Sequence, residues 1–241
     1  ELVYNSLSFG IAAMGAATLF LWLSRSMVAT AYRTAVTISG LVTAIAFYHY
    51  VRIFESWTGA YTVVNDTITA TGVKFNDAYR YVDWLLTVPL MCVEFYLITK
   101  KSGGTTSLLW KLIFASVVML VTGYFGETIY RGSSVVWGVA SGAAYFYIVY
   151  LVWFGEVAQL AQTAGAQVAK ATKTLAWFVL VGWAIYPLGY ILGTPGGLFG
   201  IQLVADAAVA SHYMDIVYNV ADAINKIGFG LVIYSLSRSQ D

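Results

Sequence analysis

The chain has 241 residues, of which 59% are hydrophobic and 10% charged, and its mean hydropathy is +0.72. A soluble domain carries about 25% charged residues, so an average soluble protein is excluded. A formal net charge of +1, without a dense basic run, argues against a nucleic-acid partner. The single cysteine, Cys92, excludes a disulfide within the chain. Composition therefore predicts an integral membrane protein whose partner is the lipid bilayer.

Seven stretches are long and apolar enough to cross a bilayer, because a spanning helix needs about 20 mostly apolar residues. They lie near residues 5–27, 33–56, 77–100, 107–128, 133–157, 172–193 and 209–236. The connections between them are short, and the sequence contains no evident internal repeat. We therefore expect an all-α membrane protein, a seven-transmembrane-helix bundle that forms one domain over residues 1–241.

Lysine and arginine residues outside the spans predict the orientation, because cytoplasmic loops collect positive charge. One side of the predicted bundle holds Arg25, Arg33, Lys100, Lys101, Lys111, Lys170, Lys173 and Arg238. The other side holds Lys74 and Arg131. The N-terminus is therefore expected outside and the C-terminus inside, in a plasma or inner membrane.

The connection between the second and third spans, residues 58–76, has a composition typical of strands. Its β-branched residues flank the turn-forming pair Asn65-Asp66. This pattern predicts a small β-hairpin on the outer side.

Ionisable residues inside the spans are costly, and each is a hypothesis about function. They are His49 in the second span, Arg80, Asp83 and Glu94 in the third, and Asp215, Asp222 and Lys226 in the seventh. Asp222 and Lys226 are four residues apart and share a helix face. Asp83 and Glu94 are eleven residues apart, close to three turns and about 16 Å of rise, so they point the same way at different depths. A buried lysine must lose its proton or acquire counter-ions, so we expect Lys226 to meet Asp83 and Asp222 if the two spans touch.

Structural roles are alternatives for several of these residues. Glu94 is also compatible with an acid that stays protonated and hydrogen-bonded, His49 with a satisfied core histidine, and Asp215 with a helix interface close to solvent. Cys92 is expected to be a small packing residue. No metal site is expected.

Aromatic residues accompany the buried charges. Trp84 adjoins Asp83, Trp137 lies on the fifth span, and the sixth carries Trp183, Tyr186, Pro187 and Tyr190. Such stripes are usually core packing. Beside a buried lysine they favour a cage around a long apolar ligand, since lysine amines form Schiff bases with carbonyl compounds. Pro187 is expected to kink the sixth helix and to leave a backbone carbonyl without its partner, which suits a hinge.

Three motifs together resemble a known family. They are Arg80-Tyr-Val-Asp-Trp-Leu-Leu-Thr-Val-Pro-Leu-Met-Cys-Val-Glu94, Trp183-Ala-Ile-Tyr-Pro187 and Asp222-Ala-Ile-Asn-Lys226-Ile-Gly-Phe-Gly230. The chain resembles the microbial rhodopsins, and among them the proton-pumping proteorhodopsin and xanthorhodopsin group.

The resemblance implies a light-driven outward proton pump, an ion transporter rather than an enzyme, with no soluble substrate. Lys226 would carry all-trans retinal as a protonated Schiff base, and Asp83 would be its counter-ion and proton acceptor. Asp222 would be the second counter-ion and Glu94 the cytoplasmic proton donor. The order Asp83, Thr87, Glu94 matches the pattern associated with outward proton pumps.

The same resemblance implies supporting residues. Those coupled to the acceptor would be His49, Arg80 and Thr87. The retinal pocket would contain Trp84, Met91, Trp137, Ser141, Trp183, Tyr186, Pro187, Tyr190 and Tyr218. Met91 matches the group's spectral tuning position, where an apolar residue favours green over blue absorption.

Two departures from family patterns concern proton release and a second chromophore. The outer glutamates that release protons in archaeal pumps have no evident match in residues 193–211, and Asp215 is the substitute we expect. Gly138 stands where archaeal pumps have tryptophan. In xanthorhodopsin-like proteins a glycine there opens a window for a carotenoid (xanthophyll) antenna, whereas the alternative is that Gly138 only eases helix packing. A homo-oligomer, pentamer or trimer, is also implied.

Three other functions compete. A light sensor that signals through a partner would share the lysine and its cage, but Glu94 argues against it, because a sensor does not need fast reprotonation. A light-independent transporter is disfavoured by the lack of inverted repeats and broken spans. A hormone-type receptor is disfavoured because its cytoplasmic signature motifs are missing.

Overall fold

A computed structural model of the chain describes residues 1–65, 67–76, 78–193 and 207–239, without the side chains of residues 190, 192, 193 and 207–211. The α-helices are α1 (Leu2–Leu23), α2 (Arg33–Ala60), α3 (Tyr79–Thr99), α4 (Thr106–Tyr124), α5 (Ser134–Trp153), α6 (Glu156–Thr163), α7 (Ala166–Trp177), α8 (Ile185–Gly193) and α9 (Ala207–Arg238). Short 3₁₀ turns are η1 (Ser24–Met27), η2 (Thr30–Tyr32), η3 (Lys100–Ser102) and η5 (Arg131–Ser133), and π-helical segments are η4 (Phe125–Ile129) and η6 (Phe178–Gly182).

Seven helical stretches in the described residues have the length and apolarity of membrane spans, as the sequence predicts. They are Leu2–Met27, Thr30–Ala60, Tyr79–Ser102, Thr106–Ile129, Arg131–Thr163, Ala166–Gly189 and His212–Arg238. The largest differences from the predicted bounds are the fifth span, which continues to Thr163, and the sixth, which begins at Ala166. Hydropathy marks only the apolar part of a helix, and these polar turns continue the helices beyond it.

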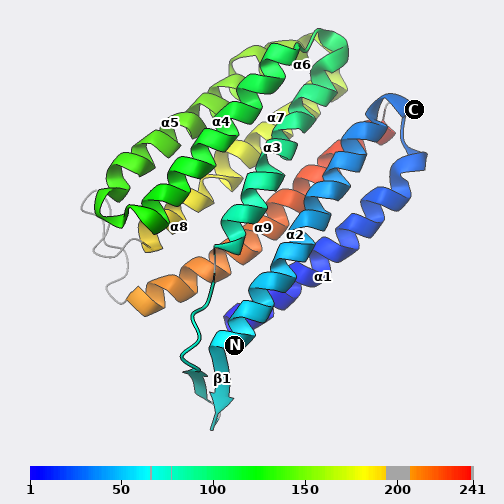
Figure 1. Cartoon of the computed structure of the whole chain (residues 1–241). Helices are drawn as coiled ribbons and strands as arrows, with labels where there is room; N and C mark the ends of the chain where they lie inside the picture. Colours follow the sequence, from blue (N-terminus) through cyan, green and yellow to red (C-terminus); the bar gives the residue numbers. More distant parts are fainter. Residues whose placement is uncertain (66, 77, 194–206, 240–241) are drawn as a thin grey trace.

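The predicted β-hairpin is confirmed. Strands β1 (Tyr61–Val64) and β2 (Thr67–Ala70) pair antiparallel, with Tyr61 opposite Ala70 and Val64 opposite Thr67. Asn65 takes a left-handed φ of 49°, which asparagine tolerates in tight turns, while Asp66 lies outside the described residues. Figure 1 places the hairpin and the N-terminus at one end of the bundle and the C-terminus at the other.

The spans form a closed ring of neighbours in which α2 contacts α1 and α3, α4 contacts α3 and α5, and α9 contacts α1, α2, α7 and α8. Large apolar side chains such as Leu19, Phe114 and Phe146 face outward and are more than half exposed. The interior, by contrast, buries His49, Arg80, Asp83, Glu94, Asp215, Asn219, Asp222, Asn225 and Lys226. A soluble protein has the opposite distribution, with apolar residues inside and charged residues outside. Here the ionisable side chains are gathered inside the ring of helices.

The sixth span is irregular before Pro187 rather than at it. The π-helical segment η6 ends at Gly182 and the chain turns at residues 183–184 before α8 begins. The carbonyl oxygen of Trp183, which the proline ring deprives of its usual helical donor, accepts from the backbone N–H of Tyr186 at 3.2 Å. The predicted loss of a helical bond is thus compensated by a tighter turn.

Candidate functional site

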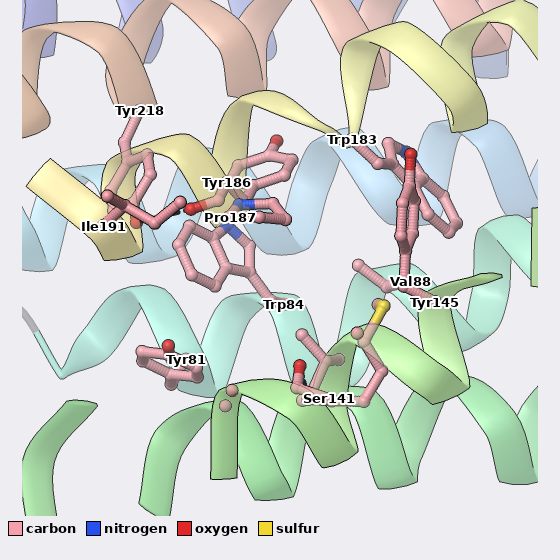
Figure 2. A pocket seen from close by; sticks show the side chains of 15 residues that line it. Tyr81, Trp84, Val88, Ser141, Tyr145, Trp183, Tyr186, Pro187, Ile191 and Tyr218 are labelled. Carbon is pink, nitrogen blue, oxygen red and sulfur yellow. Dashed lines mark hydrogen bonds between the residues drawn. The ribbon is translucent and has the colours of Figure 1, made fainter. Parts of the chain in front are cut away.

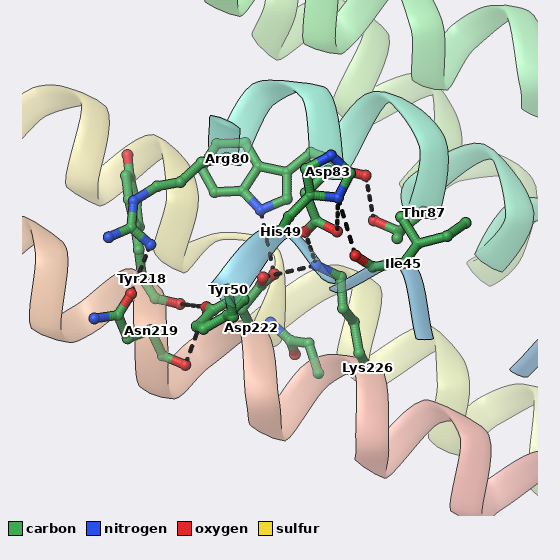
Figure 3. A network of polar contacts seen from close by, with 12 residues as sticks. Ile45, His49, Tyr50, Arg80, Asp83, Thr87, Tyr218, Asn219, Asp222 and Lys226 are labelled. Atoms are coloured by element: carbon green, nitrogen blue, oxygen red, sulfur yellow. Dashed lines mark hydrogen bonds and ion pairs between the residues drawn. The ribbon is translucent and has the colours of Figure 1, made fainter. Parts of the chain in front are cut away.

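A buried lysine between two carboxylates forms the centre of the bundle. The Lys226 ammonium donates to Oδ2 of Asp83 and, at 2.6 Å, to Oδ2 of Asp222 (Figure 3). All three side chains are at most 3% exposed. The cluster joins α3 to α9, and its one positive and two negative charges give Lys226 the counter-ions that the sequence requires.

Asp222 is the better satisfied of the two carboxylates. Its Oδ1 accepts from Trp84 Nε1 at 3.2 Å and from the Tyr186 hydroxyl at 2.9 Å, while its Oδ2 holds Lys226. Hydrogen bonds of this kind stabilise the charged form of a carboxylate. Asp222 is therefore suited to remain an anion beside the lysine.

Asp83 has a vacant acceptor atom. Its Oδ1 has no hydrogen-bond partner within the described part of the chain, and His49 Nδ1 lies 3.8 Å away, which is too far for a hydrogen bond. His49 Nδ1 instead lies 2.9 Å from the carbonyl oxygen of Ile45 (Figure 3). Thr87 Oγ1 donates to the backbone carbonyl of Asp83 at 2.9 Å, not to its carboxylate. Asp83 thus keeps one oxygen that can take a proton.

Arg80 does not join this cluster. Its guanidinium donates to Oδ1 of Asp215 at 3.1 Å and to Oδ1 of Asn219 at 2.6 Å, and it lies over the ring of Tyr218. Asp215, expected at a helix interface close to solvent, is instead 3% exposed and paired with this arginine. The interior therefore holds a second ion pair outward of the first. Arg80 lies about one turn from Asp83 on α3, and Asp215 lies about two turns from Asp222 on α9. The role of Asp215 as a release group stays a prediction.

Glu94 lies buried on the cytoplasmic side, apart from the other charges. It accepts a hydrogen bond from the Ser39 hydroxyl of α2. Within the described ranges, no lysine or arginine forms an ion pair with it. Ser39 was not singled out from the sequence, because a lone serine on an apolar helix has many structural roles.

An apolar cavity of about 160 Å³ lies between residues of α3, α4, α5, α8 and α9 (Figure 2). It is lined by Tyr81, Trp84, Val88, Met119, Leu120, Gly123, Gly138, Ser141, Gly142, Tyr145, Trp183, Tyr186, Pro187, Ile191 and Tyr218. Trp84 and Tyr186 line the cavity and also donate hydrogen bonds to Asp222. Two side chains of the cavity wall therefore contact this counter-ion directly. A Cβ added at Gly142 would meet nothing within 4 Å.

The cavity contains most but not all of the predicted pocket. Met91 is buried in the core without lining it, and Trp137 stacks on Tyr130 with ring centroids 5.4 Å apart. The side chain of Tyr190 lies outside the described residues. Tyr145 was missed, although it follows Gly138, Ser141 and Gly142 at helical spacing on α5.

An outer carboxyl group was also missed. Glu127, in the π-helical segment η4, accepts a hydrogen bond from the hydroxyl of Tyr81, which lines the cavity. The segment in which the release glutamates of archaeal pumps have no evident match, residues 193–211, includes 194–206, which lie outside the described residues. Glu127 comes at the end of the fourth span, and nothing near it in the sequence indicates Tyr81 as its partner.

Comparisons with known proteins agree with this arrangement. The model of the family described as bacteriorhodopsin-like proteins matches residues 2–240. A green-light absorbing proteorhodopsin of Gamma-proteobacterium EBAC31A08 is 37% identical over 239 residues, which cover 97% of this chain and 86% of that protein.

Solved structures give the same result. The crystal structure of thermophilic rhodopsin is 39% identical, with a TM-score of 0.87 over 99% of this chain and 93% of that one. Xanthorhodopsin, described as a light-driven ion pump with dual chromophore, is 34% identical, with a TM-score of 0.86 and the same coverage. The family's chromophore is retinal. The chain thus belongs to the bacteriorhodopsin-like family and is a microbial (type 1) rhodopsin, an integral protein of the cell membrane.

Proposed function

We propose that this rhodopsin is a light-driven outward proton pump with all-trans retinal bound covalently at Lys226. The observation that carries the proposal is the placement of two buried carboxyl groups on α3. Asp83 contacts Lys226 Nζ, and Glu94 lies about 16 Å further along the helix towards the cytoplasm. One group can accept a proton from the lysine nitrogen, and the other can return one from the opposite side.

The residues present fit retinal. The cavity is apolar and walled by aromatic rings, as a polyene ligand requires, and the open space next to Gly142 leaves room in its wall. Two of its lining residues, Trp84 and Tyr186, donate to Asp222, which binds Lys226. Retinal bound at Nζ as a protonated Schiff base would supply light absorption and an isomerisation that changes the surroundings of the nitrogen. Trp84, Tyr186 and Trp183 would hold it and exclude water from the nitrogen.

On the outer side, Asp83 is the proton acceptor. Its Oδ2 already contacts Lys226 Nζ, so a proton has a direct path between the two atoms. Its Oδ1 lacks a hydrogen-bond donor within the described residues, whereas Oδ1 of Asp222 has two. Hydrogen bonds therefore stabilise the charged form of Asp83 less than that of Asp222. Two residues are proposed to tune the titration of Asp83: His49, whose Nδ1 lies 3.8 Å from its Oδ1, and Thr87, whose hydroxyl binds its backbone carbonyl.

On the cytoplasmic side, Glu94 is the proton donor. An unpaired carboxylate is costly to bury, so Glu94 is suited to hold a proton. The Ser39 hydroxyl, which has a single proton, lies 3.2 Å from the carbonyl oxygen of Ala35. A protonated Glu94 can donate to Ser39 while Ser39 donates to Ala35, so the contact accommodates a stored proton.

The proposal is tested by the pH change that light produces in a lightly buffered suspension of cells. The cells express the protein and are supplied with retinal. Illumination is expected to acidify the medium, and a protonophore is expected to abolish the acidification. A coloured protein that produces no pH change would refute the pump and favour a light sensor. A colourless protein would refute retinal binding at Lys226.

A carotenoid antenna is a second proposal, favoured by the position of Gly138. This glycine lines the cavity on α5, and its neighbour Val139 is more than half exposed on the outer surface of the bundle. The test is the action spectrum of pumping after addition of a xanthophyll. Carotenoid bands are expected in the parent and should be lost in Gly138→Trp; a parent without them would refute the antenna.

The whole chain is proposed to act as one retinal-binding domain that assembles into a homo-oligomer, a pentamer or trimer. The mass of the detergent-free particle in a lipid nanodisc tests the assembly. A mass of one protomer would contradict it.

A further inference from the structure

A side-chain hydrogen bond connects the π-helical segment of the sixth span to the lysine-bearing helix α9. Asn225, the residue before Lys226, donates from Nδ2 to the carbonyl oxygen of Gly182 at 3.0 Å. Gly182 is the last residue of η6, where the backbone departs from α-helical bonding. A Cβ at Gly182 would lie 2.0 Å from Oδ1 of Asn225, so this close approach requires glycine.

The same amide also belongs to the hydrogen-bond chain of the second counter-ion. Asn225 Nδ2 lies 3.4 Å from the hydroxyl of Tyr186, and that hydroxyl donates to Oδ1 of Asp222 at 2.9 Å. Asp222 Oδ2 in turn accepts from Lys226. The single proton of the Tyr186 hydroxyl is used in the hydrogen bond to Asp222. The lone pairs of the hydroxyl oxygen therefore remain available to accept from the amide of Asn225.

We propose that Asn225 is a positioning residue that couples the sixth span to the charge at Lys226. One amide group binds the backbone of η6 and the tyrosine that serves Asp222. A change in the Lys226–Asp222 pair therefore reaches the Gly182 carbonyl through three hydrogen bonds, by way of Tyr186 and Asn225. This inference deepens the proposed pump and rests on it for its role in proton transfer, whereas the coupling itself needs no retinal.

Tyr145 supplies a matched control. Its hydroxyl lies 3.1 Å from the carbonyl oxygen of Val179 and 2.8 Å from that of Leu180, so it binds the same π-helical segment from α5. Tyr145→Phe loosens that segment without removing a bond of the Tyr186–Asp222 chain. It separates loss of the coupling from loss of packing.

The first test uses retinal-free protein. Gly182-Trp183 is the sole Gly-Trp pair in the sequence, so carbonyl-¹³C glycine with ¹⁵N tryptophan gives one selective NMR signal for the Gly182 carbonyl. Asn225→Leu is expected to move this ¹³C signal upfield, because the carbonyl loses its donor, while Tyr145→Phe leaves it near the parent value. An unchanged signal in Asn225→Leu would overturn the proposal.

The second test is a double-variant cycle on the absorption maximum of the retinal-loaded protein, which responds to the counter-ion. The shift in Asn225→Leu plus Tyr186→Phe is expected to be no larger than that of Tyr186→Phe alone, whereas Tyr145→Phe should add to Tyr186→Phe. Additive shifts for Asn225 and Tyr186 would overturn the coupling.

A further variant guards against misfolding of Asn225→Leu. Gly182→Ala retains Asn225 but displaces its amide, and it is expected to shift the absorption maximum in the same direction as Asn225→Leu. A parent that binds retinal but does not pump would refute the proposed function and leave both tests intact. A pumping parent with additive variants would refute the coupling alone.

Discussion

Replacement of Glu94 by glutamine removes the proposed proton donor while keeping its shape. The amide oxygen can still accept from Ser39, so the buried contact between α2 and α3 has no reason to open. A positioned general acid contributes roughly 10²–10⁴-fold to a proton transfer. About 16 Å of helix rise separates Glu94 from Asp83, and both side chains are buried. Without the donor, a proton from the cytoplasm must cross this buried stretch before it reaches the Lys226 nitrogen.

Reprotonation of Lys226 Nζ in Glu94→Gln is therefore expected to slow by roughly 10²-fold or more. Its rate should also fall about tenfold per pH unit as pH rises, because bulk protons replace the stored one. Flash absorption spectroscopy of membranes at several pH values measures both effects.

Glu156→Gln is the matched control. Glu156 is a cytoplasmic carboxylate paired with Lys111, with both side chains 40% exposed, and water screens such a pair. Its removal should leave the reprotonation rate close to that of the parent. A Glu94→Gln protein with the parent's rate and no added pH dependence would refute the assignment of the donor.

Substitutions at Lys226, Asp215 and Gly142 test the attachment site, the second ion pair and the cavity. Lys226→Ala should give no visible absorption band with added retinal; a band at the parent's wavelength would refute covalent attachment at this residue. Asp215→Asn removes the carboxylate that pairs with the buried Arg80, and loss of one partner of a buried pair costs about 3–5 kcal/mol. The unfolding temperature of the retinal-free protein should therefore drop clearly. An unchanged temperature would contradict a stabilising pair. Gly142→Leu should fill the cavity and slow retinal uptake. Gly132 also faces open space but does not line the cavity, so Gly132→Leu should leave uptake unchanged. Equal uptake in the two variants would argue against this cavity as the retinal pocket.

The fold was predictable because a bilayer imposes strong constraints. Inside hydrocarbon only a helix or a closed barrel satisfies its backbone, and a continuous apolar stretch of about 20 residues suits a helix, so seven such stretches predict the seven spans with few alternatives. The meeting of Lys226 with Asp83 and Asp222 was predictable for a related reason, since a buried ammonium requires counter-ions.

The partners of Arg80 and the neutral residues of the site were not predictable in the same way. The long side chain of Arg80 can turn toward either of two acidic residues, Asp83 on its own helix or Asp215 on α9, and the structure pairs it with Asp215 and with the neutral Asn219. Asn219 and Asn225 carry no charge, so hydropathy does not mark them, although both bind buried backbone or charged groups. The irregular turn before Pro187 depends on donors from α5 and α9, which are far away in the sequence.

Time-resolved infrared spectroscopy of the carboxyl groups tests the central claim most directly. A protonated carboxyl group has its own C=O band, and Asp83→Asn and Glu94→Gln identify the two bands by their loss. After a flash, the Asp83 band is expected to appear as Lys226 Nζ loses its proton, and the Glu94 band to disappear later, when the nitrogen regains one. Loss of the Glu94 band before the Asp83 band appears, or no Asp83 band at all, would contradict transfer from Lys226 to Asp83 followed by return from Glu94.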